Sequence, residues 1–169
     1  MQFFNKRFEL DALIKQVNVW HLKNDKVVFT NGCFDILHPG HVEYLHQAKA
    51  LGNRLIVGIN TDHSVVGLGK GDGRPFNNQD ARLSIIAALH SVDAVILFDE
   101  ETPIKLIEAL HPDVLVKGGD YNPMQIDKNA KDYIVGSDIM NKQGKLVTAI
   151  PFLPGFSTTT LVNKIQELA

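Results

Sequence analysis

Five short runs of apolar and β-branched residues recur along this 169-residue chain, and helix-like stretches separate them. Runs that are apolar on both faces are typical of strands buried in a parallel sheet. The predicted strands span residues 26–31, 54–60, 93–98, 113–117 and 145–152. Because parallel strands need long crossover connections, this order predicts an α/β fold in which helices cover both faces of a five-stranded parallel sheet.

Helix signals occupy the segments between these strands. Apolar residues from Leu10 to Trp20 recur at the spacing of one helix face, which predicts an N-terminal helix over about residues 8–22. The segment 67–73 is dense in glycine and is predicted to be a loop. At roughly 150 residues per domain, the length predicts one domain over residues 1–169. Further helices are predicted at 42–51, near 83–87, and at 102–111 and 157–168.

Charge and cysteine content exclude several classes of protein. The chain has 17 Lys and Arg residues and 19 Asp and Glu residues, so it lacks the excess of positive charge typical of nucleic-acid binding proteins. No nucleic-acid partner is expected. No stretch reaches the roughly 18 apolar residues that span a bilayer, so we expect a cytoplasmic protein without a membrane partner. Cys33 is the one cysteine, which excludes an internal disulfide and a four-cysteine zinc site. No residue is expected to ligate a metal.

The segment TNGCFDILHPGH, residues 30–41, follows the first predicted strand and carries the densest chemical signal. His38 and His41 lie three residues apart at a helix start, where unpaired backbone N–H groups and the helix dipole favour an anion. Gly40 between them leaves space for a phosphate to approach the backbone. The pair therefore predicts a phosphate site. Helix capping and a zinc site are the alternatives, and the second lacks further ligands in a known spacing.

This segment resembles the signature of the cytidylyltransferase-like nucleotidyltransferase superfamily, which places H-x-G-H after the first strand of a Rossmann-like sheet. The resemblance covers about residues 27–165. Four further segments are similar to the heptose 1-phosphate adenylyltransferase branch, namely LGNRLIVGINTD, GDGRP, PDVLVKGGDY and PGFSTTTLV. Glycerol-3-phosphate cytidylyltransferases differ, because they have Arg at the position of Phe152 and an acidic pair at the positions of Gly119 and Asp120.

The resemblance implies three catalytic residues. His38 and His41 match the pair that contacts the nucleotide phosphates and stabilises the transition state. Lys70 matches a loop lysine that reaches the same phosphates, although GLGKGDG has one residue more than the usual family form. Taken alone, a lysine in a glycine-rich loop is more often a solvated surface residue.

The nucleotide contacts that the resemblance implies come from three loops. Independently of it, Ser157 and Thr158 are typical helix N-caps, the glycines after the fourth strand fit an ordinary turn, and Cys33 fits a packing role without thiolate chemistry. The implied residues are Thr30, Asn31, Gly32, Cys33, Phe34, Gly40, Lys117, Gly118, Gly119, Asp120, Ser157, Thr158 and Thr159.

The sugar-phosphate side is assigned to Asp35, Arg74 and Arg82. A guanidinium is the preferred bidentate partner of a phosphate, which favours the two arginines, although helix arginines commonly lie on the surface. Asp35 is expected to order the loop and not to transfer protons.

The resemblance implies an enzyme that transfers AMP from ATP to D-glycero-β-D-manno-heptose 1-phosphate, yielding ADP-heptose for lipopolysaccharide core. ATP and a sugar 1-phosphate are then its partners, and Mg²⁺ enters on the ATP phosphates. The length leaves no room for a fused sugar kinase, so we expect a separate kinase to supply the substrate. A cytidylyltransferase for glycerol 3-phosphate or a related polyol phosphate, and a nucleotide-binding protein without turnover, are the alternatives. The oligomeric state stays open, with a homodimer as one option.

Overall fold

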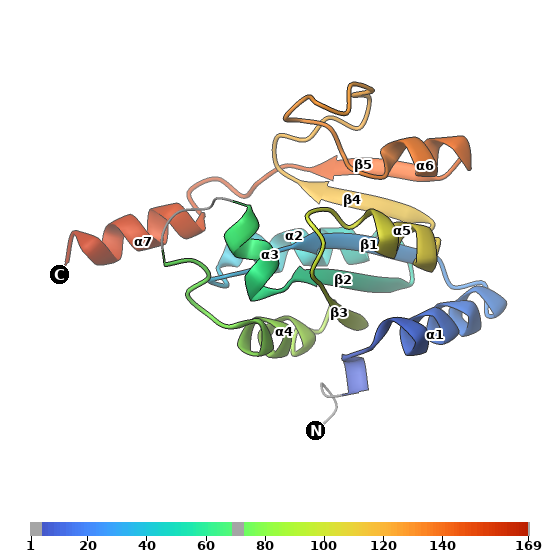
Figure 1. Ribbon diagram of the computed structural model, residues 1–169, viewed down its shortest axis with the longest axis horizontal. Coiled ribbons are helices and arrows are strands. Elements are labelled where there is room, and N and C mark those ends of the chain that lie inside the picture. Colours follow the sequence, from blue (N-terminus) through green and yellow to red (C-terminus); the bar gives the residue numbers. More distant parts are fainter. Residues whose placement is uncertain (1–4, 69–72, 169) are drawn as a thin grey trace.

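The computed structural model describes residues 5–68 and 73–168 and is built around one five-stranded parallel sheet (Figure 1). All strand pairs are parallel, in the order β3-β2-β1-β4-β5. This confirms the predicted α/β fold, and each predicted strand is present within about two residues of its expected ends. The strands are β1 (Val27–Gly32), β2 (Arg54–Asn60), β3 (Ala94–Phe98), β4 (Val114–Gly118) and β5 (Leu146–Ile150).

The helices differ from the prediction at several ends. The N-terminal helix begins two residues later than expected, the helix after β1 begins at Pro39 and not at Val42, and Pro103 precedes the helix that was expected to include it. Two six-residue helices were not predicted, because fewer than two helical turns carry too little periodicity. The helices are α1 (Leu10–Leu22), α2 (Pro39–Lys49), α3 (Asp62–Gly67), α4 (Gln79–Ala87), α5 (Ile104–Leu110), α6 (Ser137–Lys142) and α7 (Thr158–Gln166).

Helices cover both faces of the sheet, as predicted. Successive strand residues point to opposite faces, so Val27 and Phe29 join one apolar cluster with α1, α5 and α6. Val28 joins a second cluster with α2 and α4. Both clusters consist of buried side chains, which explains why the strands read as continuously apolar.

The strand order places a crevice beside β1. From β1 the chain builds outward through β2 to β3, then returns across the sheet to form β4 and β5 on the other side. The connections after β1 and β4 therefore lead in different directions, and ligands of open α/β sheets bind where this happens. Among the described residues, no helix is long and apolar enough to cross a membrane.

Candidate functional site

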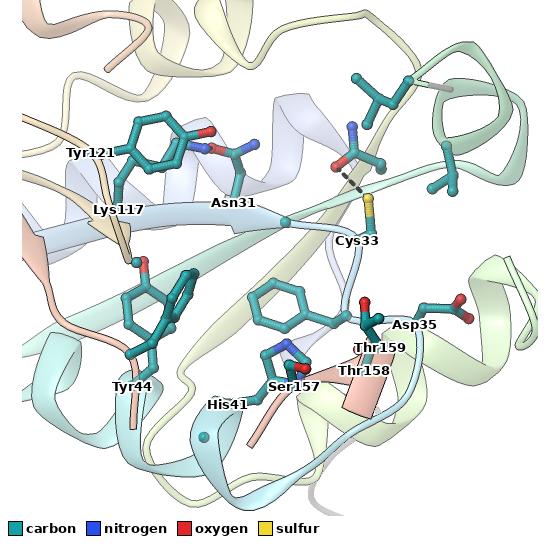
Figure 2. Close-up of a pocket in the computed structure, with 18 of the residues that line it drawn as sticks. Asn31, Cys33, Asp35, His41, Tyr44, Lys117, Tyr121, Ser157, Thr158 and Thr159 are labelled. Carbon is teal, nitrogen blue, oxygen red and sulfur yellow. Dashed lines mark hydrogen bonds between the residues drawn. The ribbon is translucent and has the colours of Figure 1, made fainter. Parts of the chain in front are cut away.

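A pocket of about 760 Å³ opens where β1, β2 and β4 end (Figure 2). Asn31 and Gly32 at the end of β1, Asn60 at the end of β2 and Lys117 at the end of β4 all line it. The N-terminal residues of α2 and α7 line it as well. Strand ends and two helix N-termini thus converge on one cavity, an arrangement suited to an anionic ligand.

The two histidines stack at the start of α2. Their ring centroids lie 3.8 Å apart, with 22° between the ring planes. His38 holds the N-cap position in extended backbone, yet its side chain makes no capping hydrogen bond. Gly40 permits the stack, since a Cβ atom there would lie 3.0 Å from the His38 ring. Phe34 packs its ring against His41 at 5.2 Å, edge to face. Packing, and not capping, therefore fixes the pair.

Burial also sets the charge of His38. Desolvation lowers the pKa of the His38 imidazole below its ordinary value of 6.5 and so favours the neutral ring. Its Nδ1 atom is buried, and no other described residue forms a hydrogen bond with it. A buried polar atom of this kind is satisfied when a ligand supplies the partner. The ring is thus ready to receive a ligand.

The loop between β1 and α2 is held in a tight conformation. Phe34 has φ of +49°, a region that bulky residues rarely adopt. The buried Asp35 carboxylate accepts hydrogen bonds from the Phe76 and Asn77 amides at 2.8 and 3.0 Å, and Arg74 Nη1 lies 3.0 Å from it. Asp35 therefore orders the loop, as expected. Asp35 and Arg74 both line the pocket, but each is already paired with the other.

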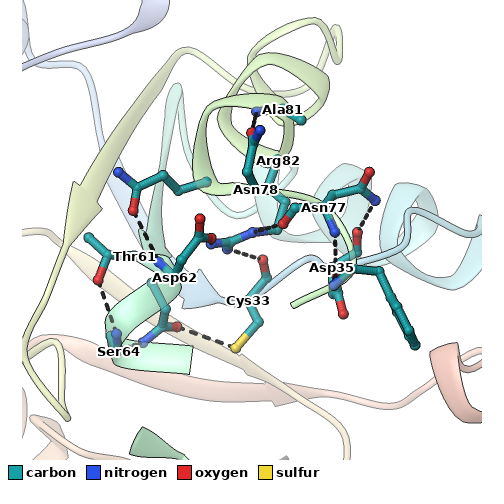
Figure 3. Close-up of polar contacts among 12 residues, drawn as sticks. Cys33, Asp35, Thr61, Asp62, Ser64, Asn77, Asn78, Ala81 and Arg82 are labelled. Atoms are coloured by element: carbon teal, nitrogen blue, oxygen red, sulfur yellow. Dashed lines mark hydrogen bonds and ion pairs between the residues drawn. The ribbon is translucent and has the colours of Figure 1, made fainter. Parts of the chain in front are cut away.

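Arg82 supports the same loop through contacts of its guanidinium (Figure 3). Its side chain is 0% exposed and is not among those lining the pocket. Nε donates to the Asn77 carbonyl at 3.0 Å, Nη1 to the Cys33 carbonyl at 2.7 Å, and Nη2 to Asp62 at 2.7 Å. The structure therefore does not support the expectation that Arg82 faces the sugar phosphate, because its guanidinium is occupied by two main-chain carbonyls and the Asp62 carboxylate.

Two further residues of the β1 end have fixed roles. Thr30 is completely buried, does not line the pocket, and its hydroxyl lies 2.6 Å from that of Tyr44. Tyr44 donates to the Val116 carbonyl at 3.3 Å, and burial raises the pKa of its hydroxyl. Cys33 lines the pocket, with Sγ 3.7 Å from Asn60 Oδ1. Thr30 thus helps to position Tyr44, which lines the pocket, and does not reach the pocket itself.

The end of β4 places the Lys117 ammonium in the pocket, directly before a turn at Gly119. Lys117 Nζ lies 2.5 Å from Asn31 Oδ1 and 5.5 Å from the centroid of the Tyr121 ring. Gly119 has φ of +90°, and a Cβ atom there would lie 2.1 Å from the Phe152 ring. Only glycine fits this position. Gly118 lines the pocket with Lys117, whereas Gly119 and Asp120 lie outside its lining.

The N-terminus of α7 completes the pocket. Ser157, Thr158 and Thr159 line it, and Ser157 Oγ caps the helix by accepting the Thr160 amide at 3.0 Å. Capping and pocket lining thus coexist, which the sequence had left open. Lys70, the third expected catalytic residue, lies outside the described residues.

Several lining residues were not predicted. Tyr44 lies three residues after His41, on the same helix face, and this spacing was the available signal. The others are spread over segments far apart in the sequence, and tertiary contacts decide which of their side chains face the pocket. They are Asn60, Val65, Leu68, Glu101, Thr102, Pro103, Tyr121, Lys131, Tyr133, Val135, Leu153 and Phe156.

The structure also bears on metal binding. Among residues 5–68 and 73–168, no three His, Cys, Asp or Glu side chains gather so that they could hold an ion. Mg²⁺ that arrives on a nucleotide takes most of its ligands from phosphates and water, and so it needs no such cluster.

Comparison with known proteins points to one family. The cytidylyltransferase-like family matches residues 29–164. The "Bifunctional protein HldE" of Hyphomonas neptunium is 48% identical to this chain over 93% of its residues. The protein of the same name from Wolinella succinogenes is 51% identical over 92%. The chain spans 30% of the length of these relatives. A solved lipopolysaccharide core biosynthesis protein from Thermoplasma volcanium is 29% identical, with a TM-score of 0.57 over 76% of this chain and 97% of that one.

Proposed function

Because the chain belongs to the cytidylyltransferase-like family of nucleotidyltransferases, we propose that it transfers AMP from ATP to D-glycero-β-D-manno-heptose 1-phosphate. The products are ADP-heptose, a precursor of lipopolysaccharide core, and pyrophosphate. One observation carries the transferase chemistry: the stacked His38 and His41 at the N-terminus of α2 share a pocket with the hydroxyl-rich N-terminus of α7. Two helix N-termini with imidazole and hydroxyl donors suit a polyphosphate.

The proposed reaction needs positioning more than covalent help. The acceptor phosphate is already ionised near pH 7, so its oxygen attacks the α-phosphorus of ATP in line with the departing pyrophosphate without a general base. His41 and the α2 backbone N–H groups stabilise the charge that grows on the α-phosphate. Neutral His38 contributes a hydrogen bond. Lys70 is proposed to reach the same phosphates. Mg²⁺ bound to the triphosphate offsets its charge.

The choice of heptose and of ATP is also a proposal. It is supported by the similarity to HldE proteins and to a solved lipopolysaccharide core biosynthesis protein, and by the VKGGDY and PGFSTT segments. Phe152 and Gly119, two positions that depart from the cytidylyltransferase pattern, pack against each other. They therefore form one unit, and we propose that this unit sets the preference for adenine.

We further propose that residues 1–169 form one nucleotidyltransferase domain that acts in the cytoplasm, where ATP and sugar phosphates are made. Cytidylyl transfer to a polyol phosphate is the second candidate, since the H-x-G-H loop is similar in both groups.

A pyrophosphate-release assay that crosses ATP and CTP with heptose 1-phosphate and glycerol 3-phosphate tests the proposal. We expect release mainly with ATP and heptose 1-phosphate. Release mainly with CTP and glycerol 3-phosphate would establish the second candidate. ATP binding by calorimetry without release from any pair would instead indicate a nucleotide-binding protein without turnover. His41→Ala is the control, because it removes release that belongs to this site and leaves release by a contaminating enzyme.

A further inference from the structure

The pocket is lined from both faces of the sheet. The helix that holds the two histidines, α2, packs in the apolar cluster of one face, together with α4. Helices α5 and α6 pack in the cluster of the other face. Glu101 lies just before α5, Lys131 lies in the connection from β4 to α6, and both line the pocket. The pocket therefore has an α2 side and a second side, the α5–α6 side, which is defined by these two residues.

The two segments of the α5–α6 side pack against each other. Gly136 directly precedes α6, and a Cβ atom there would lie 2.6 Å from Ile107 Cδ1 in α5. Ile134 is fully buried in the same apolar cluster as Ile107. Glu101 and Lys131 thus belong to segments that form one wall of the pocket.

Hydrogen bonds fix the main chain beside both charged residues. Ser64 Oγ donates to the Glu100 carbonyl at 3.0 Å and accepts from Asn60 Nδ2 at 2.9 Å. The Asn122 amide donates to the Asp132 carbonyl at 2.9 Å, which closes the loop after β4. The position of each charged residue along this wall is therefore set by its neighbours in the chain.

Each of the two segments also has a charged residue outside the pocket, and that residue is paired. Glu100 forms an ion pair with Lys105 at 3.0 Å, and Lys128 forms one with Asp138 at 2.6 Å. None of these four side chains lines the pocket.

The side chains of Glu101 and Lys131 differ from these paired neighbours. Over residues 5–68 and 73–168, neither side chain forms a hydrogen bond or an ion pair, with each other or with any other group. Both are exposed and line the pocket. Their hydrogen-bonding capacity is therefore available to a bound molecule.

The chemistry of the two side chains indicates what that molecule presents to them. A carboxylate only accepts hydrogen bonds and an ammonium only donates them, whereas a hydroxyl group can do both. The hydroxyl groups of a sugar therefore satisfy both side chains. A phosphate placed here would be repelled by the Glu101 carboxylate. The α5–α6 side thus favours an uncharged polyhydroxylated group.

Resting on the proposed function, we infer that Glu101 and Lys131 bind hydroxyl groups of the acceptor sugar and so help to select the sugar phosphate. The phosphate of the acceptor then points toward the α2 side, where the reacting phosphates of ATP are proposed to bind. Phe152, which is proposed to set the preference for adenine, lines a smaller cavity with Tyr44 of α2. The nucleotide is therefore accommodated on the α2 side, and the sugar on the α5–α6 side.

The test is steady-state kinetics of four variants, with ATP and heptose 1-phosphate varied in turn. Lys131→Met should raise the KM for the sugar phosphate roughly tenfold, because a hydrogen bond from a charged group is lost. Glu101→Gln should raise it by roughly three- to tenfold, since the amide keeps a weaker acceptor. The KM for ATP should change by less than about twofold. Lys128→Met and Glu100→Gln are the matched controls, because they remove the same charges from the same segments outside the pocket.

Inhibition by methyl phosphate separates contacts with the sugar from contacts with its phosphate. Methyl phosphate has the phosphate of the acceptor without the hydroxyl groups of a sugar. Its inhibition constant, measured against heptose 1-phosphate, should change by less than about twofold in Lys131→Met and in Glu101→Gln. An increase as large as the increase in KM would show that these residues bind the phosphate, and would overturn the inference.

Three kinetic results would also overturn it: a rise in the KM for ATP as large as that for the sugar phosphate, an equal rise in the two controls, or no change at all. Thermal unfolding of each variant shows whether a loss reflects folding, and either pocket variant tests the inference if the other does not fold. The proposed function fails separately, if the wild-type enzyme uses CTP and glycerol 3-phosphate. Glu101 and Lys131 are then judged by the KM for glycerol 3-phosphate, because that acceptor also has uncharged hydroxyl groups.

Discussion

Helices α2 and α7 both present their N-termini to the pocket, but they are held in different ways. α2 buries Leu45 and Ala48 against the sheet, so the core of the protein positions His38 and His41. α7 has no buried residue and extends away from the sheet (Figure 1), and its first turn is fixed locally by the Ser157 cap. Preorganised donors serve a transition state best, whereas adaptable donors suit substrate binding. We therefore expect turnover to depend mainly on α2, and nucleotide affinity to depend mainly on α7.

The largest effect is expected at His41. His41→Ala should lower kcat roughly a hundredfold or more, because one donor to the growing charge on the α-phosphate is lost, and leave ATP affinity nearly unchanged. His41→Asn keeps a hydrogen bond without an imidazolium and should recover part of the loss. Turnover and ATP calorimetry on the three proteins measure both quantities. A defect confined to ATP binding would remove the distinction between the two helices.

A smaller effect, of the opposite type, is expected at Ser157. Ser157→Ala removes the cap of α7, which is worth about 1 kcal/mol, and should raise the KM for ATP roughly three- to tenfold while kcat changes by less than about twofold. Asn163→Ala is the control, because Asn163 lies on the same helix, is exposed and does not line the pocket. If Ser157→Ala lowered kcat as strongly as His41→Ala, α7 would belong to the catalytic machinery too.

The pH dependence of stability measures the cost of burying His38. The pKa of His38 is lowered in the folded state, so below 6.5 the unfolded chain binds a proton that the folded chain resists. The contribution of His38 is therefore fully present above pH 6.5 and is lost as the pH falls through the folded pKa. Melting temperatures at pH 7.5 and 5.5 should drop further for wild type than for His38→Gln. Equal drops would show that His38 titrates normally.

The smallest effect is expected at Cys33, which directly follows β1 and lines the pocket. Cys33→Ser should leave kcat nearly unchanged, because the proposed mechanism forms no covalent intermediate. Single-turnover assays with a matched thermal melt test this. A loss near a thousandfold in folded protein would require thiolate chemistry and would end the comparison.

Most of the fold could be predicted because the buried strands are long enough to carry a pattern. β2 was predicted with its observed ends, since its apolar run is bounded by Gly52 and by polar residues. α3 and α6 could not be predicted, because six residues do not complete two helical turns. Tertiary contacts, and not local pattern, stabilise such short helices.

The candidate site was predictable where its residues share one loop. His38, Gly40 and His41 are close in sequence, and the structure brings them together in the pocket. Arg82 was assigned to the sugar phosphate because a guanidinium is the preferred partner of a phosphate, and its burial depends on contacts with Asp62 and the Cys33 carbonyl, 20 and 49 residues away. The contact between Phe152 and Gly119 likewise joins two distant loops, which no spacing reveals.

The contacts of the Arg82 guanidinium allow the side chains of the loop between β1 and α2 to change during evolution. Two of its three partners are main-chain carbonyls, which every residue type carries. Replacing the side chain of Cys33 keeps the accepting oxygen in place, so sequence change there does not loosen the loop. Asp62 is the one side chain that must be preserved with Arg82. Side chains of this loop that line the pocket can therefore be replaced, and with them the preferred acceptor, while the geometry of the histidine pair is kept.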